Sequence, residues 1–306
     1  MAVANVPQKT VGTRRMLTIR RKNHIHKDEL SILGTLLLIA FAIVMFFPFV
    51  LLIGHAFMTY GELFHFPPIV IPYQWTTQNF YTLILALNAS TVPFSRYAFN
   101  SILVSVSVVM GVVMIATIAA YPLSKMKQMP GRGLLWFLVI ASLMYSGPVA
   151  EIPRYLVVTH LHLINTEWAL ILPSVVSSFG LFLMRQFVDS IPDEIIEAAR
   201  IDGASDFRIL FRIIYPATQP AWATLIMLTF IAEWGNAGAS QLYLQNQALK
   251  TLPVAFTTLG AAGTNQVAFA GAIAAAGLIM ALPPVIVFLV FQARVIQTMA
   301  FAGLKG

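Results

Sequence analysis

Six long apolar runs dominate this chain and limit the kind of structure it can form. They lie near residues 32–54, 99–123, 134–157, 168–188, 220–244 and 269–295. Each can cross a hydrocarbon layer ~30 Å thick, since an α-helix rises about 1.5 Å per residue and about 20 residues suffice. A backbone inside lipid must satisfy its hydrogen bonds internally, so each run is expected to be helical. The sequence therefore predicts an all-α, polytopic membrane protein with six transmembrane helices.

The composition agrees with this class. Of the 306 residues, 58% are hydrophobic and only 10% are charged, whereas roughly a quarter of the residues in a soluble domain are charged. The chain has no cysteine, which excludes disulfides, thiolate metal sites and cysteine nucleophiles. The six histidines show no metal-ligand spacing, so no metal site is expected. The first run is too long for a signal-peptide core, and we expect it to remain as an uncleaved anchor.

The basic residues predict the orientation of the chain in the membrane. All but three of the 19 Lys and Arg residues fall in the N-terminal tail, at the C-terminus, or near the connections between runs two and three and runs four and five. Because Lys and Arg concentrate on the cytoplasmic side, both termini are expected in the cytoplasm. Residues 1–31 would be a basic cytoplasmic tail, and residues 32–306 the transmembrane domain. The net charge of +7 then reflects topology, and no nucleic-acid partner is expected.

The outer connection, residues 55–98, is the longest between runs and is rich in aromatic residues and proline. Trp and Tyr favour the headgroup level of a bilayer. The segment is thus interpreted first as an aromatic belt, with a docking surface for a partner protein as the alternative.

A charged segment between the fourth and fifth runs carries the most specific pattern. Acidic residues open a short helix in which Ser190 or Asp193 is the expected cap. Gly203 suits a helix end or sharp turn that a Cβ would disfavour. A second helix is expected with Ser205 or Asp206 as its cap, ending at Pro216. Taken alone, the pattern also fits a plain amphipathic helix lying on the membrane surface.

This segment resembles the EAA loop of ABC importer permeases, the inner-membrane components of binding-protein-dependent transport systems. Glu197-Ala198-Ala199, Gly203, Ile213 and Pro216 fall in the family's register, while Tyr215 stands where Leu is usual. The resemblance implies that the loop is a coupling helix that docks in a cleft of the ATPase subunit and transmits its closure. The implied coupling residues in this chain are Glu197, Ala198, Ala199, Asp202, Gly203, Ala204, Phe211 and Pro216.

Shorter motifs resemble the carbohydrate branch of the same family. They are Asn100-Ser101, Tyr121-Pro122-Leu123-Ser124, Asn165-Thr166, Trp168-Ala169, Arg200-Ile201-Asp202-Gly203-Ala204 and the C-terminal Gly303-Leu304-Lys305-Gly306. The resemblance implies the six-helix permease of a maltose-type or oligosaccharide-type importer in a bacterial-type cytoplasmic (inner) membrane. The implied partners are a second permease in a heterodimer, two ABC ATPase domains, an extracytoplasmic solute-binding protein and a sugar substrate.

The chain itself carries no phosphate-binding Gly-x-x-x-x-Gly-Lys-Ser/Thr motif. It is therefore expected to be a non-catalytic subunit that binds no cofactor, with ATP and Mg²⁺ held by the partner ATPase subunits.

Polar residues within the apolar runs are candidates for the translocation path. A charge at the bilayer centre costs about 3 kcal/mol on insertion scales, so such residues should face a cavity, a partner helix or an interface. The hypothesis is that six residues line the path or its outer gate: Glu151, Arg154, Tyr155, Glu233, Trp234 and Asn236. The alternative is that Arg154 reaches the outer interface and pairs with Glu151.

Other functions remain open on the sequence alone. An importer of peptides or of another polar organic solute would share these features. A secondary transporter or channel would need an intramembrane ion or proton relay, for which Glu151 and Glu233 are the available carboxylates. An intramembrane enzyme would need a nucleophile–base or metal pair that the apolar runs do not offer.

Overall fold

The computed structural model describes residues 27–88, 92–145, 147–260 and 267–303, and in this part of the chain all regular structure is helical. In chain order the helices are α1 (Lys27–Phe57), α2 (Tyr60–Leu63), α3 (Gln78–Asn88), α4 (Phe94–Lys125), α5 (Arg132–Leu143), α6 (Gly147–His160), α7 (Trp168–Val175), α8 (Ser178–Asp189), α9 (Asp193–Ile201), α10 (Asp206–Ile209), the π-helix η1 (Leu210–Ile214), α11 (Tyr215–Ala217), α12 (Gln219–Trp234), α13 (Ala237–Tyr243), the 3₁₀-helix η2 (Gln247–Leu249), α14 (Leu252–Gly260) and α15 (Ala270–Gly303).

Four helical stretches of the described chain are long and apolar enough to cross a membrane. They are Ile32–Phe57, Phe94–Lys125, Trp168–Asp189 and Ala270–Val295. They coincide with the first, second, fourth and sixth expected spans. The all-helical membrane class is confirmed, while the count of six stays a prediction.

The third, fourth and fifth expected spans are each divided into two helices, the fourth into α7 and α8. In the third run, α5 ends at Leu143 and α6 begins at Gly147. In the fifth, α12 ends at Trp234, and Asn236 caps α13 by accepting a hydrogen bond from the amide of Ala239 at 3.2 Å. The 16 residues of α12 rise only about 24 Å, so the fifth run crosses a bilayer only if both helices contribute.

The described chain divides into two units, one on each side of the boundary between Pro48 and Phe49. In the first, the side chains of residues 32–48 on α1 are all exposed, as expected for a helix that meets lipid. All sites described below belong to the second unit.

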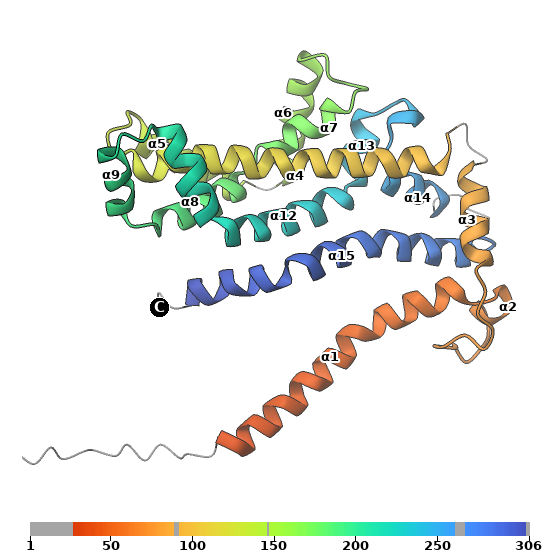
Figure 1. Ribbon diagram of the computed structural model, residues 1–306. Helices are drawn as coiled ribbons and strands as arrows, with labels where there is room; N and C mark the ends of the chain where they lie inside the picture. The colour runs from red at the N-terminus through yellow and green to blue at the C-terminus, as the bar shows by residue number, and fades with distance from the viewer. Residues whose placement is uncertain (1–26, 89–91, 146, 261–266, 304–306) are drawn as a thin grey trace, which may run out of the picture. The chain divides into compact units, whose positions relative to one another are not determined.

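Helix α4 is the central element of the second unit and packs against α7, α8 and α12 (Figure 1). Its buried residues follow a four-residue spacing, as in Val104, Val108 and Val112, which places them on one face. Glycine permits the closest approach: a Cβ on Gly111 would lie 2.6 Å from a methyl carbon of Val175 on α7. The α4 face contributes to each of the three apolar clusters of the unit.

Polar side chains attach α4 to the segment that precedes α14. The side-chain nitrogen Nδ2 of Asn100 donates to the backbone carbonyl oxygens of Ala248 at 2.8 Å and Lys250 at 3.0 Å. The hydroxyl of Ser101 accepts a hydrogen bond from the backbone amide of Leu252, the first residue of α14, at 2.7 Å. Both side chains are buried, where an unpaired polar group would be costly. The Asn100-Ser101 motif thus has a structural role here.

The outer connection is organised around Glu62 on α2. Its carboxylate accepts hydrogen bonds from the amides of Thr59 at 3.2 Å, Tyr73 at 3.1 Å and Gln74 at 3.0 Å. Desolvation tends to raise the pKa of this carboxyl, but the hydrogen bonds together outweigh it and leave the pKa lowered. One ionised side chain therefore holds the backbone of residues 59 and 73–74 together.

Candidate coupling and path sites

The turn after α9 explains why a glycine stands at position 203. Gly203 has a φ of +77°, which is the left-handed region. Its amide bonds to the carbonyl oxygen of Arg200 at 3.0 Å, and the amide of Ala204 bonds to that of Ala199 at 2.9 Å. This pair of bonds is the Schellman motif, in which a left-handed residue ends a helix. The alanines at 199 and 204 meet inside that turn because they are small.

The start of α9 differs from the expectation. Pro192 occupies the cap position and no side chain caps the helix, so the prediction of Ser190 or Asp193 as cap is wrong. Asp193 instead forms ion pairs with Lys125, the last residue of α4, and with Lys127 on the connection that follows, each at 2.8 Å. These hydrogen bonds lower the pKa of Asp193 to about 2, and the bond from Lys125 has the largest effect. The hydrogen bond that Lys127 donates to the Asp193 carboxylate raises the pKa of Lys127.

The second helix also differs in how it ends. Ser205 caps α10, as expected, and accepts from the amide of Arg208 at 3.4 Å. Pro216 does not stop the helix, however: the chain stays helical through η1 and α11 as far as Ala217. Pro216 lies in the first turn of α11, where a missing amide is tolerated. The helix therefore ends one residue after Pro216, and Thr218 separates α11 from α12.

A three-residue ring joins the turn to α4. The hydroxyl of Tyr121 donates to the carboxylate of Asp206 at 2.8 Å, and Arg200 donates to the same oxygen at 3.1 Å and to the Tyr121 hydroxyl at 3.4 Å. The hydrogen bond from Tyr121, and then that from Arg200, lower the pKa of Asp206. The hydrogen bond to Asp206, followed by that to Tyr121, raises the pKa of Arg200. Both ends of the Gly203 turn are thereby fixed to one transmembrane helix.

The segment of residues 193–209, here called the α9–α10 segment, has one buried and one exposed face. Ile196 and Ile209 are buried in a cluster with residues of α4, α8 and α12. On the other side Ile201 is 87% exposed and Phe207 is 76% exposed. Large apolar side chains this exposed, next to a run of charged residues, are typical of a surface that binds another protein.

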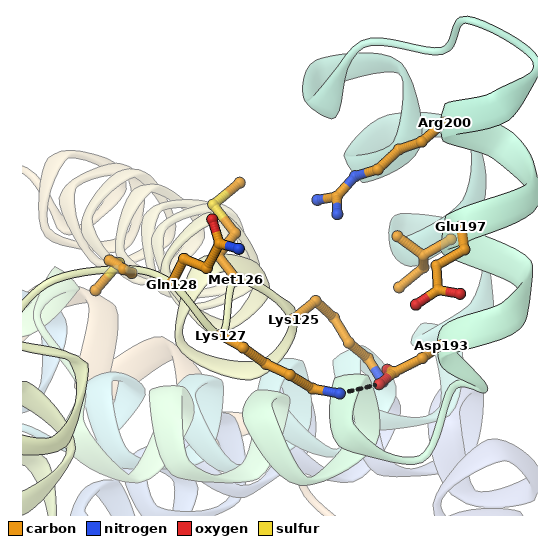
Figure 2. Close-up of a pocket in the computed structure, with 9 residues that line it drawn as sticks. Lys125, Met126, Lys127, Gln128, Asp193, Glu197 and Arg200 are labelled. Carbon is orange, nitrogen blue, oxygen red and sulfur yellow. Dashed lines mark hydrogen bonds and ion pairs between the residues drawn. The ribbon is translucent and has the colours of Figure 1, made fainter.

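A cavity of about 550 Å³ lies between α9 and the end of α4. Figure 2 shows Glu197 and Arg200 extending from α9 toward the connection that carries Met126 and Gln128. The Lys127–Asp193 ion pair spans the cavity. The residues that line the cavity carry charges of both signs as well as apolar groups. Such a lining is better suited to contact another protein than to bind a small anion.

The predicted coupling residues divide according to exposure. Six are exposed, namely Glu197, Ala198, Asp202, Gly203, Phe211 and Pro216. Ala199 and Ala204 are half-buried and pack on the cluster of Ile196 and Ile209. We therefore expect these two alanines to shape the turn, and the exposed residues to be available to a partner.

Five of the six predicted path residues form a chain of neighbours that runs from Tyr243 through Arg154 to Glu233. Tyr155 on α6 stacks on Tyr243 of α13, with ring centroids 6.1 Å apart. Glu151 and Arg154 lie close enough to act electrostatically on Tyr243, and Arg154 acts in the same way on Glu233. The side chain of Glu233 lies beside those of Ser174 and Asn236.

Two details qualify the path hypothesis. Among the described residues no ion pair joins Glu151 to Arg154, although α6 runs through both positions and includes Pro153. Arg154 instead lines a cavity of about 370 Å³ between α6 and α7. Trp234 is buried, and its indole nitrogen donates to the carbonyl oxygen of Met280 at 3.0 Å. Trp234 thus packs between α12 and α15, and its place on the path or gate stays a prediction.

Sequence reasoning missed several residues at these sites. Lys125, which fixes the α9–α10 segment, and Ser174 and Tyr243, which complete the polar group, were not singled out. Tyr121 and Arg200 stood only in short motifs, and Asp206 only as a possible helix cap. These contacts give little signal in the sequence, because Lys125 reaches Asp193 across 68 positions and Arg200 reaches the Tyr121 hydroxyl across 79, and both depend on how the helices pack.

The comparisons with known proteins agree with these features. Residues 28–301 match the family model described as "Binding-protein-dependent transport system inner membrane component". The crystal structure of a bacterial ABC transporter involved in the import of the acidic polysaccharide alginate has a chain with the same fold. The TM-score is 0.75 at 22% identity, covering 88% of this chain and 98% of that one.

Curated relatives span most of the chain. The inner membrane ABC transporter permease protein YcjP of Escherichia coli K12 is 29% identical over 268 residues, covering 87% of this chain and 93% of that protein. The polygalacturonan/rhamnogalacturonan transport system permease protein YtcP of Bacillus subtilis 168 is 35% identical over 225 residues, with 72% and 73% coverage. The sn-glycerol-3-phosphate transport system permease protein UgpE of Escherichia coli O1:K1 is 28% identical over 259 residues, with 84% and 91% coverage. With the helical fold and the α9–α10 segment in register, the chain belongs to the family of binding-protein-dependent transport system inner membrane components.

Proposed function

We propose that this chain is the permease subunit of an ATP-driven ABC importer that moves a sugar or oligosaccharide from an extracytoplasmic binding protein into the cytoplasm. Family membership supports the permease role. The names of the relatives, for polygalacturonan/rhamnogalacturonan and for sn-glycerol-3-phosphate, and the alginate importer support a sugar-type substrate. As a permease the chain is non-catalytic, and ATP with Mg²⁺ would be held by the ATPase subunits.

The α9–α10 segment carries the proposal. It would be the coupling helix, with Glu197, Ala198 and Asp202 facing the ATPase cleft and Gly203 setting the turn. Phe211 and Pro216 would extend this surface, while Ala199 and Ala204 shape it from inside. The exposed Ile201 and Phe207 support the docking role, since apolar groups at a cytoplasmic connection have neither lipid nor core to cover them.

The transport cycle would be alternating access. ATP binding closes the ATPase dimer, the coupling helix moves with it, and the cavity opens outward; hydrolysis returns it inward. Such a cycle requires ligands with different affinities for the two states. The cluster of Glu151, Arg154, Tyr155, Glu233 and Asn236 would lie along the path, where carboxylates and amides pair with sugar hydroxyls.

The proposed assembly follows the family's architecture. Six transmembrane spans, near residues 32–54, 99–123, 134–157, 168–188, 220–244 and 269–295, would place both termini in the cytoplasm of a bacterial-type cell. A second permease would complete a heterodimer bound to two ATPase domains. The basic connections support this orientation.

Purification in mild detergent from native membranes tests the proposal. Mass spectrometry should find an ABC ATPase and a second permease eluting with this chain. Any solute-binding protein encoded with them would then be screened against mono- and oligosaccharides. Elution of this chain without an ATPase, together with uptake driven by an ion gradient, would refute the importer assignment, and a binding protein specific for peptides would refute the sugar.

A further inference from the structure

The contact between Tyr121 and the α9–α10 segment links the proposed docking surface to a transmembrane helix by a route other than the chain itself. Along the chain, the segment continues through η1 and α11 into α12. The Tyr121 hydroxyl adds a second connection, to α4, through Asp206 and Arg200. Movement of the docking surface would therefore reach two helices.

The geometry of these hydrogen bonds fixes how the α9–α10 segment is oriented relative to α4. The Tyr121 ring is 3% exposed and immobilised by packing on α4, so its hydroxyl has a fixed position. Asp206 accepts from both donors through one carboxylate oxygen. Arg200 and Asp206 stand on opposite sides of Gly203, and its left-handed turn brings them together. Charge-assisted hydrogen bonds of this kind fix orientation as well as distance.

Simple stabilisation does not account for the arrangement. The side chains of Arg200 and Asp206 are both about half exposed, and ion pairs at such positions contribute little to stability. The buried Ile196, Ile209 and Ile214 already attach the segment to the core. Apolar packing thus keeps the segment folded, and the three polar side chains fix its position relative to α4.

We propose that Tyr121, Asp206 and Arg200 are positioning residues that fix the docking surface against α4 and pass its displacement to that helix. This inference rests on the proposed coupling role of the α9–α10 segment. From its cytoplasmic end α4 runs to Asn100 and Ser101, which bond to the segment before α14. A displacement at Tyr121 would hence reach the opposite end of the unit through one continuous helix.

The test measures solute imported per ATP hydrolysed by the complete complex in proteoliposomes. Tyr121→Phe removes the hydroxyl and keeps the ring, and Asp206→Asn removes the carboxylate charge. Tyr97→Phe is the matched control, because Tyr97 is also buried on α4 and its hydroxyl makes no hydrogen bond within the described part of the chain. Tyr121→Phe and Asp206→Asn should lower the ratio at least about fivefold, with ATPase recovery and thermal stability close to wild type and Tyr97→Phe unchanged.

The double variant distinguishes a shared role from two separate ones. Residues that act through one contact are non-additive, so Tyr121→Phe combined with Asp206→Asn should be no worse than the stronger single variant. Wild-type ratios in both single variants would overturn the inference and leave the importer assignment intact. Loss of folding or of ATPase recovery in both would also overturn it, by showing a structural role. Failure of the wild-type complex to contain an ATPase would instead refute the proposed function.

Discussion

At the scale of single residues, backbone conformation accounts for Gly203 better than side-chain space does. No atom lies within 4 Å of the position that a Cβ would take there, yet the φ of +77° is unfavourable for L side chains. The family motif therefore requires glycine for the turn that it forms. Most of the motif's other residues are free to face a partner.

Gly203→Val should weaken the turn by roughly 1–2 kcal/mol, because a branched residue is forced into the left-handed region. Gly203→Asn should cost much less, since Asn tolerates that region. The amount of ATPase that elutes with each variant checks this, and the valine variant should retain less. Equal recovery from both would show that the turn conformation does not matter for docking.

Asp193 gives a pH-dependent contribution whose sign follows from its lowered pKa. The pKa falls from 3.8 to about 2 in the folded chain, so the stabilising ion pairs are fully present above about pH 4 and are lost as the pH falls toward 2. Asp193→Asn should unfold at a lower temperature than wild type at neutral pH, and this gap should close between about pH 4 and pH 2. Thermal unfolding in detergent across this range measures the gap. A gap that stays constant with pH would contradict the role of the charge.

At the scale of elements, close packing of α4 against its neighbours depends on small residues. Gly111→Ala would place a Cβ 2.6 and 2.9 Å from two methyl carbons of Val175, and overpacking of this kind costs typically 1–3 kcal/mol. Gly133→Ala on α5 is the control, because nothing lies within 4 Å of its Cβ position and alanine favours helix by up to about 1 kcal/mol. Thermal unfolding should move down for the first and unchanged or up for the second. Shifts in the same direction would mean that α4 and α7 do not approach as closely as described.

The helices themselves were largely predictable, and their interruptions were not. Apolar length predicted the stretches at Phe94–Lys125 and Ala270–Val295 well, because length and hydropathy are local properties. The divisions after Leu143 and Trp234 arise where polar or glycine residues lie inside an apolar run. Whether such a residue breaks a helix depends on its tertiary partners, as with Asn236 and the amide of Ala239.

The candidate sites follow the same distinction. The α9–α10 segment could be located because its motif is local and specific. The residues that fix it, Tyr121 and Lys125, lie far away in sequence, and only the packing of α4 against α9 brings them near. Proline at 216 was expected to end a helix, and the helix ends one residue beyond it, at Ala217, because a proline in the first turn of α11 is tolerated there. Trp234 was expected to face substrate and is buried by packing between helices.

At the scale of the whole molecule, the absence of cysteine from the sequence permits a clean test of topology. Tyr73→Cys and Lys127→Cys place single thiols at positions where the native side chains are 80% and 72% exposed. A membrane-impermeant maleimide should label Tyr73→Cys when only the outer surface is accessible, and Lys127→Cys only after permeabilisation. Labelling in the reverse order would show that the basic connections lie outside, and the α9–α10 segment could then not meet an ATPase in the cytoplasm.

The central claim is that ATP hydrolysis on partner subunits drives solute movement through this chain. The most direct measurement is uptake of the solute by proteoliposomes that contain the purified complex, with the solute-loaded binding protein on the outer side. Uptake should require ATP inside the vesicles and should be unaffected when ion gradients are collapsed. Uptake that continues without ATP and follows an imposed ion gradient would contradict the account.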